Sequence, residues 1–533
     1  MDTKALRQKV LDLAIRGKLV PQDPNNEPAS VLLERIRQQK QQMVKEGKLK
    51  AKDIKNDSII FVGEDNLHYE KFNDGNVKCI EDEIPFDLPD GWAWCRLQSI
   101  ATIQSSKRVF EKDYVDDGIP FYRSKEIGDL SRNEEIRSQL FITESHYLEL
   151  KEKYGAPQIG DILITSVGSI GNTWICDGRQ FYYKDGNITQ IVANSLFVSE
   201  YVQLFLKTDY FFEQVGKTVS GSAYNALTIE KLKNILFALP PYNEQQRIVN
   251  ALKPYNELVE TIEVSKTDLL QLLSKTKAKI LDLAIRGQLV PQDPSDEPVS
   301  VLLERIRAGK EELIKQGKIK RDKKQSVIFR GDDNSYYEKI GSVVICIDEE
   351  VPFEIPDNWE WMRLESCCIK EIRRGKSPKY IDESGTLVFA QKCNTKYSGI
   401  DVGLALFLDE STLGRYPDDE YMHDGDVVIN STGTGTLGRV GIYHATDNHL
   451  GLPIVPDSHV TVIRATHSIQ AFYMYAFMKA NQSELEKKGE GSTNQKELKP
   501  LTLKEMLIPI PPYSEQERIV DALTAAFSTI SAI

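Results

Sequence analysis

One long passage occurs twice in this chain. Residues 9–40 read "KVLDLAIRGKLVPQDPNNEPASVLLERIRQQK", and residues 279–310 read "KILDLAIRGQLVPQDPSDEPVSVLLERIRAGK". The passages match at 25 of 32 positions without a gap. A period near 270 residues is far too long for a solenoid, whose repeats have about 20–50 residues. The repeat therefore predicts a tandem duplication of a unit of domain size.

The duplication extends well beyond this passage. "GKLKAKDIKNDSIIFVGEDNLHYEKF" from Gly47 is echoed by "GKIKRDKKQSVIFRGDDNSYYEKI" from Gly317, and "IPFDLPDGWAWCRL" from Ile84 by "VPFEIPDNWEWMRL" from Val351. "LPPYNEQQRIVNAL" from Leu239 returns as "IPPYSEQERIVDAL" from Ile510. Residues 98–233 and 365–504 mostly diverge. We call these two stretches the variable domains and the repeated remainder the shared frame.

The shared frame contains a long predicted helix over residues 244–286. Asn243 and Glu244 follow two prolines as a helix start, and Gly287 with Pro291 beyond it marks the stop. A heptad pattern is apolar at nine of eleven positions and favours a coiled-coil seam; a helix buried inside one compact domain is the alternative. The positions are Ile248, Leu252, Tyr255, Val259, Ile262, Lys266, Leu269, Leu273, Thr276, Ile280 and Leu283.

The second copy of this helix is divided between the chain ends. Ile533 corresponds to Ile262 in repeat register, so the second copy stops halfway. The opening "MDTKALRQKVLDLAIRG" matches the missing half, with Leu6, Val10 and Leu13 on the seam. We therefore expect the two chain ends to meet and to build a second helix antiparallel to the first, with near two-fold pseudo-symmetry.

Composition limits the classes of function. The chain has 533 residues, 41% hydrophobic and 27% charged, as is ordinary for a folded protein of several domains. No apolar run reaches membrane-spanning length, and the N-terminus is polar rather than signal-like. Seven cysteines without a C-x-x-C pair predict reduced, buried thiols in a cytoplasmic protein. The net charge of −12 gives no general attraction to nucleic acid, so such binding requires local patches.

The repeated segments "LDLAIRGKLVPQDP" and "LPPYNEQQRIV" around two divergent domains resemble the specificity subunit of type I restriction–modification enzymes. The resemblance implies two globular, mixed α/β target-recognition domains separated by two long antiparallel coiled-coil helices. Each domain would read one half of a bipartite site on double-stranded DNA. The helices would set the gap between half-sites and dock two modification (methyltransferase) subunits, and restriction subunits would join the full complex. Methyl transfer and ATP-driven cleavage would belong to those partners, so this chain would need no cofactor.

The predicted domain organisation follows the repeat. Residues 1–50 form an N-terminal helical segment that completes the second helical region, and 51–235 form the first target-recognition domain with its entry segment. Residues 236–320 hold the central coiled-coil helix and the following repeat. Residues 321–505 form the second target-recognition domain, and 506–533 the C-terminal helix. Strand-like runs such as "DILITSV" and "HVTVIRA" alternate with helical stretches such as "VSEYVQLFLKT" in the variable domains, which favours mixed α/β units.

Several motifs suggest an enzyme, and each lacks its required context. "LPPY" from Leu239 resembles the methyltransferase D/N-P-P-Y loop, but Leu239 cannot accept the amine hydrogen bond, and we predict a strand-to-helix turn. "GTGTLG" from Gly433 matches G-x-G-x-x-G, yet a strand-like "RVGIYHA" follows where a dinucleotide site needs a helix. We predict a strand–loop–strand hairpin there and in "GDILITSVGSIGNTWI". No histidine spacing indicates a metal site.

Four loops in each variable domain combine Gly, Ser, Asn and basic residues at matching places. They are residues 105–108, 122–126, 166–172 and 220–225 in the first domain, and 373–380, 390–396, 431–439 and 490–496 in the second. Phosphates favour Arg and Lys, whereas base edges favour Arg, Asn, Gln and small hydroxyls, so these loops are the predicted DNA contacts; an ordinary solvated turn is the alternative for each. The first domain offers Ser105, Lys107, Arg108, Arg123, Lys125, Ser169, Asn172, Ser222, Tyr224 and Asn225. The second offers Arg373, Arg374, Lys376, Lys379, Gln391, Lys392, Thr434, Arg439, Thr493, Asn494, Gln495 and Lys496.

Two basic runs lie in the shared frame. Residues 28–55 hold eight Lys or Arg against three acidic residues, and residues 301–324 hold nine against four. A solvated helix face, a DNA-backbone contact and a docking site for a partner subunit all fit these runs. Two other classes of function also stay open at this level: a stand-alone DNA-modifying enzyme, and a coiled-coil scaffold that binds proteins and ignores DNA.

Overall fold

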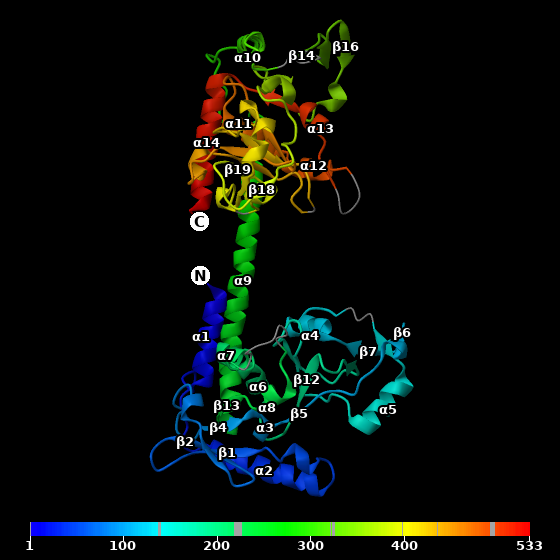
Figure 1. Cartoon of the computed structure of the whole chain (residues 1–533), viewed down its shortest axis with the longest axis vertical. Helices are drawn as coiled ribbons and strands as arrows, with labels where there is room; N and C mark the ends of the chain where they lie inside the picture. The colour runs from blue at the N-terminus through cyan, green and yellow to red at the C-terminus, as the bar shows by residue number, and fades with distance from the viewer. Residues whose placement is uncertain are drawn as a thin grey trace. The chain divides into compact units, whose positions relative to one another are not determined.

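The computed structural model describes residues 2–136, 140–217, 226–319, 321, 326–396, 398–433, 435–490 and 496–532. The chain divides into two compact units, unit 1 (Met1–Thr267) and unit 2 (Asp268–Ile533) (Figure 1). Each unit contains one copy of the shared frame and one variable domain. Helices and strands are mixed in both units, which confirms the predicted α/β class.

Unit 1 carries its variable domain between two paired strands of the frame. Strand β4 pairs antiparallel with β13, and the intervening residues form two four-stranded sheets, in the orders β10-β9-β12-β5 and β11-β7-β8-β6. The strands are β1 (Ser58–Val62), β2 (His68–Phe72), β3 (Val77–Cys79), β4 (Ala93–Arg96), β5 (Thr102–Gln104), β6 (Tyr114–Val115), β7 (Ile119–Tyr122), β8 (Phe141–Ile142), β9 (Ile162–Thr165), β10 (Thr173–Ile175), β11 (Tyr182–Tyr183), β12 (Ile188–Val192) and β13 (Leu236–Leu239). The helices are α1 (Thr3–Ile15), α2 (Ala29–Lys45), α3 (Leu97–Ile100), α4 (Ser124–Ser131), α5 (Glu144–Tyr154), α6 (Ser199–Phe205), α7 (Asp209–Lys217) and α8 (Ile229–Lys233).

Unit 2 repeats this plan with different sequences. Strand β17 pairs with β25, and between them lie sheets in the orders β18-β20-β19-β23 and β22-β21-β24. The strands are β14 (Ser326–Arg330), β15 (Tyr336–Ile340), β16 (Val343–Cys346), β17 (Glu360–Arg363), β18 (Tyr380–Ile381), β19 (Leu387–Phe389), β20 (Leu406–Leu408), β21 (Val427–Asn430), β22 (Val440–Ile442), β23 (Ile454–Pro456), β24 (Val460–Ile463) and β25 (Leu507–Ile510). The helices are α10 (Val299–Lys315), α11 (Ala471–Ala480), α12 (Gln482–Lys487), α13 (Pro500–Lys504) and α14 (Tyr513–Ser531).

The predicted central helix is one continuous element, α9 (Tyr242–Ile285), which begins in unit 1 and ends in unit 2. The first turn of α9 explains why Gln245 of "LPPYNEQQRIVNAL" recurs as Gln516 in "IPPYSEQERIVDAL". The buried Gln245 donates to the Pro240 carbonyl at 3.0 Å and accepts from the Val198 amide at 2.9 Å. In unit 2, Gln516 makes the equivalent bonds, to Pro511 at 3.1 Å and from Gln470 at 2.9 Å. The glutamine therefore joins each frame helix to its variable domain.

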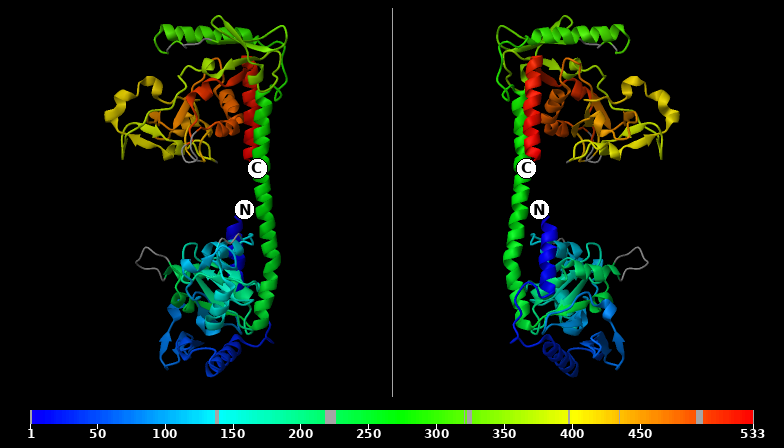
Figure 2. Two further views of the ribbon diagram at one scale, coloured as in Figure 1. Left: turned by 90° about the vertical axis from the view of Figure 1, so that its right-hand side faces the viewer. Right: turned by 90° about the vertical axis from the view of Figure 1, so that its left-hand side faces the viewer.

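Each unit contains a pair of frame helices side by side. In unit 1, α1 lies along the first part of α9, and Leu11 shares a buried cluster with Ile248 and Leu252 (Figure 2). In unit 2, the second part of α9 lies along α14, and Leu281 shares a cluster with Ile519 and Leu523. In each pair, one helix corresponds to the N-terminal half of the repeated helix and the other to its C-terminal half.

The heptad seam is only partly buried within the two units. Ile248, Leu252 and Val259 are at most 4% exposed, whereas Tyr255 and Leu269 are 46% and 42% exposed. Leu6, Val10 and Leu13 of α1 are half-buried, and Val10 packs against the core of unit 1. Packing within each unit therefore accounts for only part of the predicted seam.

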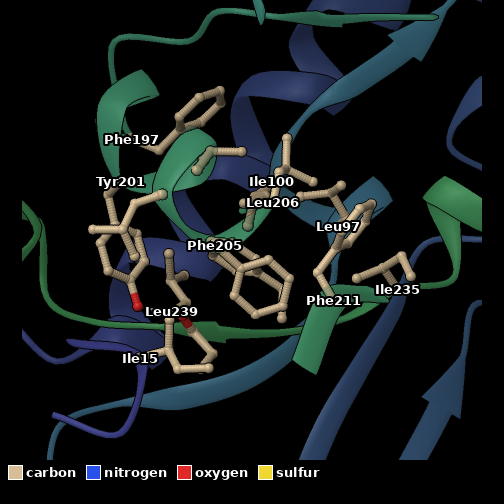
Figure 3. Close-up of a cluster of buried hydrophobic side chains, with 14 of the residues drawn as sticks. Ile15, Leu97, Ile100, Phe197, Tyr201, Phe205, Leu206, Phe211, Ile235 and Leu239 are labelled. Atoms are coloured by element: carbon tan, nitrogen blue, oxygen red, sulfur yellow. Dashed lines mark hydrogen bonds between the residues drawn. The ribbon is translucent and has the colours of Figure 1, made fainter. Parts of the chain in front are cut away.

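The core of unit 1 connects the frame helices to the variable domain (Figure 3). Phe205 of α6 packs against Phe237 of β13 with ring centroids 4.6 Å apart, and Ile15 from α1 joins the same cluster. The buried Tyr201 hydroxyl donates to the Ala238 carbonyl at 3.0 Å. Because α6 is part of the variable domain, the loops of that domain are fixed to the frame through a rigid apolar core.

Buried ion pairs brace the entry segments of both units. Arg96 contacts Glu70 at 2.7 Å, and Arg363 contacts Glu338 at 2.6 Å in unit 2. The Lys40 ammonium is also buried, 2.7 Å from the Asp57 carboxylate. Of the first basic run, residues 28–55, Lys40 is thus neutralised inside the protein, whereas the ion pairs of Arg35 and Arg37 are exposed.

The prediction of buried thiols is correct for five of the seven cysteines and wrong for Cys79 and Cys346, which are exposed. Both stand on short strands, β3 and β16, of the three-stranded sheets in the entry segments. Hydrophobicity alone predicts burial for cysteine, but β3 and β16 are edge strands in which every residue is exposed.

Candidate nucleic-acid interface

The predicted DNA loops of unit 1 gather around a short turn, residues 184–187, that joins β11 to β12. The Gly186 amide donates to the Ser105 hydroxyl at 3.3 Å. The Arg108 guanidinium pairs with the Asp185 carboxylate at 2.9 Å. These two contacts bring the loop that follows β5 against the turn.

Two further loops meet the same turn on its other side. The Asn187 carbonyl accepts from the Ser166 amide at 2.7 Å and from the Ser124 hydroxyl at 3.4 Å. Ser124 opens α4 after the loop that follows β7, and Ser166 begins the loop between β9 and β10. Three of the four predicted loops therefore lie together around residues 184–187.

Unit 2 builds the same arrangement around the turn at residues 457–459, which joins β23 to β24. The His459 carbonyl accepts from the Ser431 amide at 2.8 Å, and the His459 ring lies 2.6 Å from the Thr432 hydroxyl. Thr432 also forms a β-bridge with Glu497, whose carboxylate pairs with Arg374 at 3.0 Å. Arg374 and Thr432, from two of the predicted loops, thus meet at Glu497, which follows the predicted loop at residues 490–496.

The remaining loop of unit 2 is tied to the hairpin between β21 and β22. Gln391 accepts from the Thr436 hydroxyl at 3.3 Å, and Arg439 donates to the Asn394 carbonyl at 2.8 Å. Three of the four loops predicted for this domain are consequently brought together, and residues 491–495 of the fourth lie outside the described part of the chain. Gln391 and Arg439 each have part of their hydrogen-bonding capacity occupied by these contacts.

A common buried frame holds the loops in both domains. The Ser166 hydroxyl lies 2.8 Å from that of Thr189, and Ser431 lies 2.6 Å from Thr461 in the same relation. The Ser166 carbonyl accepts from the Leu227 amide at 2.9 Å, as the Ser431 carbonyl does from Leu498 at 2.8 Å. The two variable domains therefore share one loop-holding design although their sequences diverge.

The candidate DNA-binding cations of unit 1 differ in their exposure and in whether a carboxylate already pairs with them. Lys107 and Lys125 are exposed, and the Lys107 ammonium lies 5.2 Å from the centre of the Tyr154 ring. Arg108 keeps 65% of its side chain exposed despite its ion pair. Arg123 is held at 2.9 Å by the buried carboxylate of Glu126. Lys107, Lys125 and Arg108 are the better placed to meet a phosphate.

Ser169 and Asn172 lie in the hairpin loop between β9 and β10. The backbone N–H of Asn172 donates to the Thr165 hydroxyl at 3.0 Å, and the side-chain amide of Asn172 donates to the Ser169 carbonyl at 3.3 Å. Gly171 between them has φ +90°, and an added Cβ would stand 2.6 Å from the Phe212 ring. Glycine is required there, so the loop presents Ser169 and Asn172 in a fixed conformation.

In unit 2, one buried carboxylate binds three cations. Glu420 is 2% exposed, with the Lys370 ammonium at 3.6 Å, the Lys376 ammonium at 3.4 Å and the Arg373 guanidinium in direct contact. Burial lowers the pKa of Lys370. Arg373 and Lys376 thus balance an internal charge, which reduces the positive charge they offer to DNA.

The other candidates of unit 2 are more accessible. Lys379 is 69% exposed and pairs with Asp409 at 2.6 Å. Lys392 and Lys496 are exposed. Seven predicted residues lie outside the described part of the chain: Ser222, Tyr224, Asn225, Thr434, Thr493, Asn494 and Gln495.

The sequence interpretation missed the central turns themselves. Lys184 and Asn187 in unit 1 and His459 in unit 2 stand where the loops converge. The available signal was the short polar stretch between two strand-like runs, "KDGN" and "DSH". Such stretches are common between strands, so only the convergence of the loops distinguishes these two.

The enzyme-like motifs have the structures predicted for them. "GTGTLG" spans the turn of the antiparallel hairpin β21–β22, and its counterpart spans β9–β10. The "LPPY" segment joins β13 to α9. Within the described residues, no group of three or more His, Cys, Asp and Glu side chains could hold a metal ion. In that part of the chain no helix has both the length and the apolarity needed to cross a membrane.

Comparisons with known proteins agree with this organisation. The family model for the type I restriction modification DNA specificity domain matches twice, at residues 89–271 and 356–533. The EcoEI specificity subunit of Escherichia coli is 27% identical over 98% of this chain and 89% of its own length. The EcoAI specificity subunit of the same organism is 31% identical over 68% of this chain and 62% of its own length.

A solved chain, from work on the assembly and conformational transition of the type I R-M system, has the same fold. Its TM-score is 0.52 at 18% identity, over 84% of this chain and 93% of that one. The two matched family domains together cover more than half of the sequence. The chain therefore belongs to the type I restriction–modification DNA specificity family and is a specificity subunit.

Proposed function

We propose that each variable domain reads one half of a bipartite DNA target. The observation that carries this proposal is the pair of loop clusters around residues 184–187 and 457–459, built on the same buried hydroxyl frame. A common frame with divergent loops suits two readers that act alike on different sequences. Exposed Lys107, Lys125, Lys392 and Lys496 supply phosphate contacts, and the loop hydroxyls and amides face base edges.

The helices act as the spacer between the two half-sites. The continuous helix α9 joins the two units, and α1 with α14 supplies the divided second helix. Support comes from the two equivalent helix pairs, because each combines opposite halves of the repeated helix. In this proposal the chain ends meet, and the two helices run antiparallel as a coiled coil.

The chain recognises DNA for partner subunits and is itself not catalytic. Two modification subunits dock on the shared frame, in keeping with its duplication, and restriction subunits join the full complex. Methyl transfer from S-adenosylmethionine and ATP-driven cleavage take place in those partners. The hairpin setting of the glycine motif, between β21 and β22, supports this division of labour.

Co-expression with the modification subunit, followed by mapping of methylated sites, tests the proposal. Replacing residues 98–233 with the variable domain of a relative should change one half of the methylated sequence and preserve the other. Replacement of residues 365–504 is the matched control and should change the opposite half. A replacement that alters both halves, or methylation by the purified chain alone, contradicts the proposal.

A further inference from the structure

The entry segment of each unit carries a small module that the family domain does not include. Helix α2 with the sheet β1-β2-β3 falls within residues 29–79, and α10 with β14-β15-β16 falls within residues 299–346. The matched family domains span 89–271 and 356–533. Reading of DNA by those domains therefore does not account for the modules.

One face of each sheet presents the same side chains in the same register. In unit 1, one row across the strands is Ile59, Lys71 and Val77, and the next is Phe61, Tyr69 and Cys79. In unit 2 the rows are Val327, Lys339 and Val344, then Phe329, Tyr337 and Cys346. We call these two surfaces the sheet faces.

The sheet faces are apolar and open to solvent. Ile59, Phe61 and Val77 are 45%, 40% and 53% exposed. Their counterparts Val327, Phe329 and Val344 are 40%, 42% and 50% exposed. The ring centroids of Phe61 and Tyr69 are 5.9 Å apart, and the same distance separates Phe329 from Tyr337. The same apolar side chains are therefore exposed at the same register in both units.

Part of the opposite side of each sheet packs against the rest of its unit, although Val62, Val343 and Ile345 on that side are exposed. Ile60 packs against the core of unit 1, and Ile328 is buried in unit 2. Glu70 on this inner side pairs with Arg96, and Glu338 pairs with Arg363. The sheets are thus anchored to the frame strands β4 and β17, which lead directly into the variable domains.

The charge on the sheet faces indicates a protein partner. A single lysine, Lys71 or Lys339, stands between apolar neighbours on each face. Among the residues that the structure describes, neither lysine forms an ion pair. Binding to the DNA backbone requires many cations, and each face offers one. A protein surface with apolar side chains around one carboxylate complements the face in shape and charge.

From the duplication, the charge and the position at the base of each variable domain, we infer that the two sheet faces dock two copies of one partner, the modification subunit. The inference rests on the proposed function, because that function requires one such subunit beside each variable domain. Each face covers only roughly 200 Å², against about 800 Å² per partner in a stable interface. The sheet face is therefore an anchoring part of a larger contact.

The wild-type chain carries its own probes for this contact. Cys79 and Cys346 are exposed on the two faces, and the other five cysteines are buried. N-ethylmaleimide should label the free chain at these two thiols, as measured by intact mass and peptide mapping. Saturating modification subunit should protect both thiols. Undiminished labelling in a complex that contains two modification subunits overturns the inference.

Neighbouring residues of one strand give a matched pair of variants. Phe61→Arg places a charge on the sheet face, whereas Val62→Arg places the same charge on the other side of β1, at a position where unit 2 has Arg330. We expect Phe61→Arg to weaken one of two binding events roughly thirtyfold, as loss of an interface anchor does. Val62→Arg should bind as the wild type, and Lys71→Glu should weaken binding where Lys71→Arg does not.

Sedimentation velocity of the full chain with purified modification subunit separates the outcomes. Two subunits bound to wild type and to Val62→Arg, with one weakened site in Phe61→Arg, supports the inference. Equal binding by Phe61→Arg, with its melting temperature unchanged, overturns the inference and leaves the proposed function standing. Protection of both thiols by DNA alone overturns it in favour of a DNA contact. Failure of the wild type to bind the subunit at all overturns both the inference and the proposed function.

Discussion

Lengthening α9 should lengthen the gap between the two DNA half-sites. An insertion of four residues after Thr267 falls in an exposed part of the helix, where Val264, Leu270 and Leu272 are each about 60% exposed. The nearest buried positions on either side are Val259 and Leu281, so neither apolar cluster is disrupted.

The size of the change follows from helix geometry. Four residues at about 1.5 Å each add roughly 6 Å, which equals between one and two base pairs at about 3.4 Å each. Four residues exceed one turn by roughly 40°, a small change of phase for the helix seam. We therefore expect the same two half-sites with a gap longer by one or two unspecified base pairs.

Mapping of methylated sites in cells that carry the modification subunit measures this gap. An equal insertion in the exposed turn at residues 116–118, outside the helices and outside the sheet β1-β2-β3, is the control and should leave the gap unchanged. An active complex with the longer α9 and the original gap would refute the ruler role of the helix. An inactive complex would instead show that the divided second helix, which keeps its length, must match the first.

Three further predictions concern single residues. Lys107→Ala should weaken binding to all DNA sequences without loss of stability, and should reduce the magnitude of the slope of log affinity against log salt by about 0.9. Lys376→Ala should also lower the melting temperature, because Glu420 loses a cation. Equal melting temperatures of the two variants would contradict this contrast. Lys40→Met should cost about 3–5 kcal/mol in denaturant unfolding, since Asp57 is left as a buried, unpaired charge, while Arg35→Met at an exposed pair should cost less than about 1 kcal/mol. Burial raises the pKa of Glu244, so the folded state binds more protons than the unfolded state, and stability falls as pH rises through the raised pKa. Glu244→Gln should therefore raise the melting temperature at pH 7 but not well below pH 4. A gain in melting temperature at both pH values would exclude this cause.

The local patterns of the sequence predicted the elements that depend on near neighbours. The helix Tyr242–Ile285, the hairpins β9–β10 and β21–β22, and the turn between β13 and α9 were all expected from periodicity and capping residues. The duplication likewise predicted two similar units, and the family resemblance is confirmed by the matched domains. These features follow from residues a few positions apart, or from direct comparison of two segments of one chain.

Tertiary structure decided which of the predicted DNA residues are free. Arg373 and Lys376 have the composition of a phosphate-binding loop, but Glu420, more than 40 positions away, binds both. The turns at 184–187 and 457–459 became centres of the candidate interface only because loops from distant segments converge on them. The exposure of Cys79 and Cys346 depends in the same way on tertiary structure, because β3 and β16 lie at sheet edges where every residue is exposed. Charge partners, convergence and burial are set by contacts between residues far apart in the chain, and no local pattern records them.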